Sequence, residues 1–145
     1  MGTGFFLYGP GEHPDRLVSY VIRSLLTGQP AQCSAGGQRR DYFYVKDAAR
    51  AFVALLRSKI SGAVNLGSGA SVDVATLARR LGSLAQREDL ICLGAKPVAD
   101  DTPMVVAGQQ RLRNELGWSP EFTLEFALAE TFEWWRRRLC TIAKA

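Results

Sequence analysis

The stretch that decides the fold covers residues 36–49 and reads Gly36-Gly37-Gln38-Arg39-Arg40-Asp41-Tyr42-Phe43-Tyr44-Val45-Lys46-Asp47-Ala48-Ala49. Its glycine pair predicts a turn between two short strands, at residues 31–34 and 41–45, because glycine adopts the backbone conformations that turns require. A helix is predicted next, over residues 46–57, with Val45, Ala48, Phe52 and Leu55 on its inner face. This stretch therefore predicts strand, turn, strand and helix in succession.

Short apolar runs and amphipathic stretches alternate along the rest of the chain. The run Phe5-Phe6-Leu7-Tyr8 ends at a glycine and a proline, and predicts a buried strand that leads into a loop. Further strands are predicted at residues 63–66 and 90–93. Helices are predicted at residues 14–27, after a cap at Ser71, at residues 109–116 and at residues 123–139. The alternation predicts an α/β fold, because parallel neighbouring strands need crossover connections that are usually helical.

The predicted sheet is incomplete. Residues 5–7 and 64–66 are apolar enough for central strands that are covered on both faces. The chain offers few other strands to lie beside them. We therefore expect strands whose edges and faces need partners that these residues do not supply.

Composition favours one globular domain over residues 1–145, since the chain is 47% hydrophobic and 22% charged. No apolar run approaches the roughly 18 residues that span a bilayer. The N-terminal residues Met1-Gly2-Thr3-Gly4 lack a basic region followed by an apolar stretch, so no signal peptide is expected. The cysteines Cys33, Cys92 and Cys140 are odd in number and widely spaced, which favours a reducing compartment. These features together predict a cytoplasmic protein.

A net charge of +4 favours an anionic ligand. Nucleic acid is not the expected ligand, because the arginines are scattered over different predicted elements and form no recognisable motif. The run Arg136-Arg137-Arg138 lies near the end of the last predicted helix, where cations complement the helix dipole. It is therefore interpreted as a solvated helix end.

Metal and nucleophile sites are hard to build from this sequence. His13 is the only histidine, and no two cysteines lie at ligand spacing, so neither a zinc site nor a Ser-His-Asp triad is expected. His13 precedes a proline at a helix entrance and is expected to have a surface or capping role.

Two patterns resemble motifs of dinucleotide-dependent enzymes, but neither meets the requirements of its motif. Gly67-Ser68-Gly69 is followed by Val72, where a dinucleotide fingerprint needs its third glycine, so a tight turn is predicted. Tyr42 and Lys46 have the Tyr-x-x-x-Lys spacing of a short-chain dehydrogenase, but that pair must lie one helical turn apart. On a strand, four steps of about 3.3 Å separate them by roughly 13 Å. No catalytic residue and no cofactor-binding residue is therefore predicted.

Residues 36–49 resemble the stretch G-x-Q-x-R-D-F-x-Y/H-V-x-D-V-A of the NAD(P)-dependent epimerase/dehydratase family, the extended short-chain dehydrogenases that act on nucleotide sugars. Three further motifs resemble that family in order and spacing: Tyr8-Gly9-Pro10-Gly11, Ala63-Val64-Asn65-Leu66-Gly67-Ser68-Gly69 and Leu116-Gly117-Trp118-Ser119-Pro120. The resemblance covers nearly the whole chain. It implies the C-terminal, substrate-binding part of a Rossmann-type fold, without the N-terminal dinucleotide-binding half.

The resemblance also implies a set of substrate-binding residues. Arg40 corresponds to an arginine that contacts the substrate pyrophosphate in relatives, a task that suits a permanently charged, forked donor. The alternative for Arg40 is an ion pair with Asp41 or Asp47. Arg16 and Leu17 correspond to residues beside the nucleotide, with a plain helix-face role as the alternative. Gln32 and Cys33 correspond to the strand that meets the base.

The sequence departs from the family pattern at two places besides the absent Rossmann fingerprint. Phe6 stands where many relatives have an asparagine that touches the substrate. Residues 95–101 lack the second phosphate-binding arginine that relatives often have, although Lys96 partly replaces it. We expect a nucleotide-sugar-binding half that is inactive alone, because NAD(P) and the catalytic tyrosine belong to the other half in the family. The alternative is a binding or assembly module that forms homo-oligomers through uncovered strands.

Overall fold

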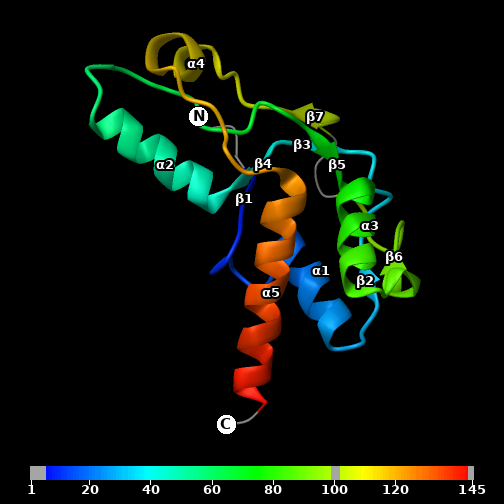
Figure 1. The fold of residues 1–145 in the computed structure, drawn as a ribbon. Coiled ribbons are helices and arrows are strands. Elements are labelled where there is room, and N and C mark those ends of the chain that lie inside the picture. The colour runs from blue at the N-terminus through cyan, green and yellow to red at the C-terminus, as the bar shows by residue number, and fades with distance from the viewer. Residues whose placement is uncertain (1–5, 99–101, 144–145) are drawn as a thin grey trace.

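The computed structural model describes residues 6–98 and 102–143 and has a mixed α/β fold (Figure 1). Its helices and strands, in chain order, are β1 (Phe6–Tyr8), α1 (Leu17–Leu26), β2 (Ala31–Gln32), β3 (Arg39–Arg40), β4 (Tyr42–Tyr44), α2 (Val45–Leu56), β5 (Val72–Asp73), α3 (Val74–Ala85), a 3-10 turn (Glu88–Leu90), β6 (Ile91–Cys92), β7 (Met104–Val105), α4 (Gln110–Leu116) and α5 (Leu124–Ile142). Phe5, the first residue of a predicted strand, lies outside the described residues.

The strands form small sheets rather than one continuous sheet. Among the described residues, β1 pairs in parallel with β4, and β2 pairs in parallel with β6. In the third sheet, β3 lies between β5, which is antiparallel to it, and β7, which is parallel. This arrangement agrees with the prediction of an incomplete sheet, since β1 has a strand on only one side within the described part of the chain.

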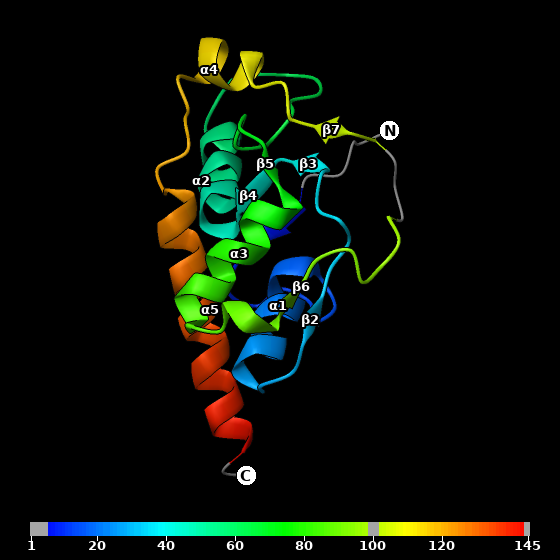
Figure 2. The same ribbon diagram turned by 90° about the vertical axis from the view of Figure 1, so that its right-hand side faces the viewer.

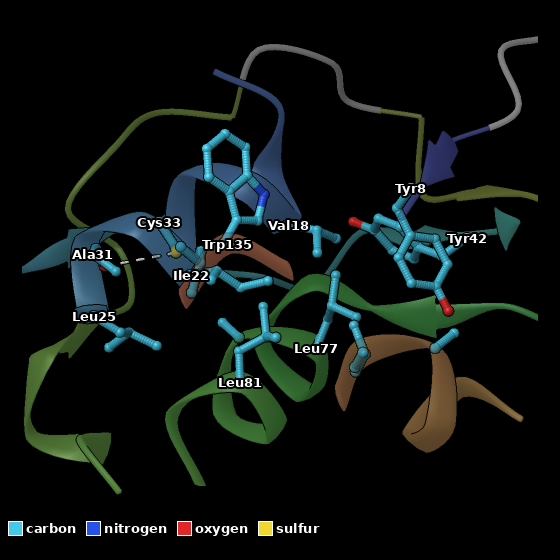
Figure 3. Packing of buried hydrophobic residues seen from close by; sticks show 14 of the residues in the cluster. Tyr8, Val18, Ile22, Leu25, Ala31, Cys33, Tyr42, Leu77, Leu81 and Trp135 are labelled. Carbon is cyan, nitrogen blue, oxygen red and sulfur yellow. Dashed lines mark hydrogen bonds between the residues drawn. The ribbon is translucent and has the colours of Figure 1, made fainter. Parts of the chain in front are cut away.

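The main core lies between three helices and the strands β1, β2 and β4. Helices α1, α3 and α5 contact one another, and α5 runs beside α1 in both ribbon views (Figures 1 and 2). Figure 3 shows Val18 and Ile22 of α1 facing Leu77 and Leu81 of α3, with Trp135 of α5 above them. These side chains are fully or almost fully buried, and the burial of apolar area is the main force that holds the three helices together.

A second, smaller core lies on the other face of β4. Successive side chains of a strand point to opposite faces. Tyr42 and Tyr44 accordingly join the main core, whereas Phe43 packs edge-on against Trp118 in the second one. All three residues of β4 are buried, so this strand is central even though its sheet has only two strands.

Helices α3 and α5 form where the sequence predicts them. The α3 residues Val74, Leu77, Ala78 and Leu81 are all buried, as their spacing indicates. The cap of α3 is Asp73 rather than the predicted Ser71: its carboxylate accepts hydrogen bonds from the backbone N–H (2.8 Å) and the hydroxyl (2.8 Å) of Thr76. These bonds lower the pKa of the Asp73 carboxyl. Thr123 caps α5 in the same way, by accepting from Phe126 N–H.

Two further local predictions are wrong. Residues 63–66 form a loop and not a strand, because no strand of the described residues pairs with them. Helix α2 has the predicted position but a different inner face: the small residues Ala48 and Ala51 are buried, whereas Phe52 is 55% exposed. In Figure 1, α2 lies on the other side of β1 and β4 from α1 and α3.

Candidate ligand-binding cleft

A cleft of about 650 Å³ opens between β1, the start of α1, and the segment around β2 and β3. This volume is within the range of small-molecule sites. The five residues that the resemblance implies for substrate binding all line it: Arg16, Leu17, Gln32, Cys33 and Arg40. The fold thus brings together residues from the start of α1, from β2 and the residue after it, and from β3.

Arg40 is almost completely buried, with 5% of its surface exposed. Its Nη1 donates hydrogen bonds to the carbonyl oxygens of Arg39 (3.0 Å) and Thr102 (2.7 Å), and its guanidinium lies 5.7 Å from the ring centre of Phe6. These contacts fix the guanidinium plane at the wall of the cleft. Phe6, which stands where the resemblance implies an asparagine, thus packs its ring against the cleft arginine.

The carboxylates of Asp41 and Asp47 have other tasks than pairing with Arg40. Asp41 is 2% exposed and accepts bonds from Ser68 N–H (2.9 Å), the Ser68 hydroxyl, Gly69 N–H (3.0 Å) and Ala107 N–H (3.1 Å). Asp47 accepts from Arg50 and from the backbone N–H groups of residues 121 and 122. Each carboxylate anchors a loop from a distant part of the chain.

The entrance to α1 forms one side of the cleft. Arg16 is exposed at the N-cap position, where its own side chain makes no capping bond, and Leu17 is the half-buried first residue of the helix. The helix begins three residues later than predicted from Pro14. Glu12 performs the capping task, since its Oε2 accepts from the N–H (3.2 Å) and the hydroxyl (2.7 Å) of Ser19 in the first turn.

Gln32 and Cys33 lie at the opposite side, on and just after β2. Their backbone N–H groups are already bonded: Gln32 donates to the Tyr20 hydroxyl (3.1 Å), and Cys33 donates to the carbonyl of Cys92 (2.9 Å). A nucleobase bound at this end would therefore contact atoms other than these two N–H groups, such as those of the exposed Gln32 side chain. Burial raises the pKa of the Cys33 thiol. The thiol therefore stays protonated and forms a small apolar part of the cleft wall.

Sequence reasoning missed several lining residues, among them Glu12, Tyr20 and Tyr42. Lys96 also lines the cleft, and its ammonium lies 4.3 Å from the ring centre of Tyr20, in a cation–π contact. Its backbone N–H donates to the carbonyl of Cys33 (3.1 Å), so the loop after β6 is tied to β2. Burial raises the pKa of Tyr42, and Arg40 opposes this effect.

The two patterns that resemble motifs of dinucleotide-dependent enzymes, Tyr42 with Lys46 and the loop at residues 67–69, have other roles in the structure. Tyr42 is buried in β4, whereas Lys46 lies in α2 and pairs with Glu130 at the surface (2.5 Å), so the two side chains do not share a helical face. The N–H groups of Ser68 and Gly69, which a pyrophosphate would need, donate to Asp41. A side chain at residue 67 would lie 2.3 Å from the Cβ of Ala107. The described residues therefore do not fit NAD at this loop.

Other site types find no support in the described ranges, 6–98 and 102–143. No group of three or more metal-binding side chains occurs within them. His13 is largely exposed, and its Nδ1 accepts a hydrogen bond from Asp15 N–H (3.3 Å), in line with the predicted surface or capping role. No helix among these residues has the length and apolar character that crossing a membrane requires.

Comparison with known proteins identifies relatives of both the sequence and the fold. The family model for the NAD dependent epimerase/dehydratase family matches residues 2–67. The dTDP-glucose 4,6-dehydratase of Salmonella typhimurium (strain LT2) is 31% identical over 139 residues, which cover 88% of this chain and 38% of that protein.

Two solved structures extend the comparison. MoeE5 in complex with UDP-glucose and NAD is 30% identical, with a TM-score of 0.81, and the match covers 93% of this chain and 46% of that one. A UDP-glucose 4-epimerase from Thermotoga maritima, solved with UDP-glucose, is 26% identical, with a TM-score of 0.84, and the match covers 92% and 44% of the two chains.

These matches define a partial fold of the extended short-chain dehydrogenase class, in agreement with the resemblance of the sequence motifs. The chain belongs to the NAD-dependent epimerase/dehydratase family. It spans about two-fifths of the length of the curated relative, the 38% given above.

Proposed function

We propose that residues 1–145 form the nucleotide-sugar-binding, C-terminal part of an NAD-dependent epimerase or dehydratase. The observation that carries the proposal is the gathering of Arg16, Leu17, Gln32, Cys33 and Arg40 around one cleft. The names of the relatives support the ligand class, since they include a dTDP-glucose dehydratase and two proteins solved with UDP-glucose.

The charges of the cleft suit a nucleoside diphosphate. Arg40, Arg16 and Lys96 line it and outnumber the carboxylates of Glu12 and Asp15. A diphosphate carries the negative charge that such an excess of cations attracts. Arg40 is the best placed of the three to select a phosphate, because bonds to two carbonyl oxygens hold its plane in place before any ligand arrives. We assign the diphosphate to Arg40 and the base to the Gln32 end of the cleft.

We infer that these residues alone do not catalyse turnover. Hydride transfer needs NAD held beside a sugar and a tyrosine that acts as acid or base, and the described residues provide neither arrangement. In this proposal, NAD and the catalytic tyrosine belong to the remaining part of the family architecture. Residues 1–145 position the sugar nucleotide.

Titration calorimetry of the 145-residue polypeptide tests the proposal. UDP-glucose or dTDP-glucose is expected to bind with a Kd of roughly 0.1 mM, about −5.5 kcal/mol. The matching nucleoside diphosphate should compete, and glucose alone should not. NAD reduction should stay at the background rate when sugar nucleotide and NAD are both added. If neither sugar nucleotide gave heat at millimolar concentration, the binding role would be contradicted. Turnover of a sugar nucleotide would contradict the inactivity.

A second candidate function is self-assembly, which the exposed apolar residues favour. Leu7 on β1 and Phe52, Val53 and Leu56 on α2 are between 42% and 85% exposed. Exposed strand edges and apolar patches drive association. Light scattering is expected to show dimers or larger species, and Phe52→Gln to shift them toward monomer. Leu84→Gln on α3 is the control, since Leu84 is also exposed (41%) but lies on another element. A stable monomer at high concentration would rule this function out.

A further inference from the structure

Glu12 is a carboxylate whose position is fixed within the cleft. It lies in the loop between β1 and α1 and is half-buried. Its Oε2 accepts two hydrogen bonds from Ser19, and the Ser19 hydroxyl in turn accepts a bond from the indole N–H of Trp135 (3.0 Å). A chain of hydrogen bonds from α5 through α1 thus holds this carboxylate. It is not a mobile surface acid.

The carboxylate has capacity for further donors. An ionised carboxylate can accept about four hydrogen bonds, and Ser19 is its only donor among the described residues. Burial raises the pKa of the Glu12 carboxyl, while the bonds from Ser19 and the nearby charge of Arg16 lower it. Its negative charge therefore lacks full compensation, and a ligand group that donates hydrogen bonds would supply it.

In the proposed function, Glu12 belongs to the side of the cleft away from the base. It follows β1, which pairs in parallel with β4. Gln32 and Lys96 belong to the β2 and β6 side. If the base occupies the Gln32 end and the diphosphate meets Arg40, the sugar is the part of the ligand that reaches Glu12.

We propose that Glu12 is a specificity-determining residue that accepts hydrogen bonds from the hydroxyl or amino groups of the sugar and disfavours sugars that carry a carboxylate. The inference rests on the proposed function, because it takes the direction of the ligand from it. Neutral hexoses and amino sugars gain a fixed acceptor in this arrangement. A uronate places a second negative charge beside the first in a partly desolvated site, and like charges repel there.

Calorimetric titration with UDP, UDP-glucose, UDP-glucosamine and UDP-glucuronate tests this. The wild-type chain is expected to bind UDP-glucose about tenfold more tightly than UDP-glucuronate, and UDP-glucosamine at least as tightly as UDP-glucose. In Glu12→Gln, the ratio between UDP-glucose and UDP-glucuronate is expected to fall to about twofold or less. Glutamine keeps an oxygen that can accept from Ser19, so the fold of α1 should persist, and thermal melting checks this.

Glu88→Gln is the matched control. Its carboxylate accepts a hydrogen bond from the Ser83 hydroxyl (2.6 Å), as that of Glu12 does from Ser19, but it lies outside the cleft. This variant should keep the wild-type ratio, which would exclude a general effect of lost charge. An unchanged ratio in a folded Glu12→Gln, or tighter binding of UDP-glucuronate by the wild type, would overturn the assignment of Glu12. Failure of the wild type to bind any of the four ligands would overturn the proposed function and this inference with it.

Discussion

Replacing Asp41 by asparagine is expected to lower the free energy of unfolding by about 3 kcal/mol. The carboxylate is fully buried and accepts bonds from three backbone N–H groups and one hydroxyl, which it shares between its two oxygens. Asparagine has one oxygen, and its amide would face N–H groups that also donate. Buried donors would then lose their acceptors, which costs more than the loss of an exposed bond.

Urea unfolding followed by tryptophan fluorescence measures this effect. A loss of about 3 kcal/mol corresponds to a fall in Tm of roughly 6–12 °C for a chain of this size. Asp89→Asn is the control, because Asp89 forms a solvent-accessible ion pair with Arg87 and such pairs contribute little to stability. A change in Asp41→Asn no larger than in the control would show that the loops at residues 67–69 and 107 do not depend on this carboxylate.

Local spacing predicted the helices that pack through their own apolar faces. The residues of α3 at positions 74, 77, 78 and 81 are buried as expected, because one side of that helix meets both α1 and α5. Helix α2 differs, since its small residues Ala48 and Ala51 pack into the second core while Phe52 stays exposed. Sequence spacing gives the period of a helix, but the neighbouring elements decide which side faces the core.

The strand prediction failed where pairing with a neighbouring strand, and not the strand propensity of the residues, decides whether a strand forms. The run Ala63-Val64-Asn65-Leu66 has the composition of a strand, yet it forms a loop because the described chain offers it no partner. The strand β4 succeeds with similar composition, because β1 pairs with it at residues 6–8. A strand is stable only with its hydrogen-bonding neighbour, and single-sequence patterns do not show which neighbour is present.

The candidate site could be predicted only in part. The family resemblance implied Arg40, which belongs to the motif at residues 36–49, and four other residues that line the cleft. The role of Asp41 was not predicted, since its partners lie 27 to 66 residues away in sequence. Glu12 was not assigned to the cleft either, because its place in the cleft wall and its hydrogen bonds to Ser19 depend on how the loop after β1 packs against α1.

Replacing Arg40 is expected to have the largest effect on ligand binding. The proposed contact is between a guanidinium and a diphosphate, and hydrogen bonds between charged groups contribute about 1.5–3 kcal/mol. Arg40→Met should therefore weaken UDP-glucose binding about 100-fold, and Arg40→Lys about tenfold. Lysine keeps the positive charge but has no planar fork, so it cannot hold the carbonyl oxygens of Arg39 and Thr102 and a phosphate in one plane.

Arg39 provides the matched control for this prediction. It is the neighbouring arginine on the same strand, but its side chain is exposed and donates to the hydroxyl (3.0 Å) and carbonyl (2.9 Å) oxygens of Ser71, outside the cleft. Arg39→Lys should change the Kd for UDP-glucose by less than about twofold. Thermal melting of each variant separates a loss of binding from a loss of fold, because Arg40 also supports β3. If a folded Arg40→Met binds UDP-glucose as tightly as the wild type, the diphosphate does not lie against this guanidinium, and the proposed direction of the ligand in the cleft is wrong.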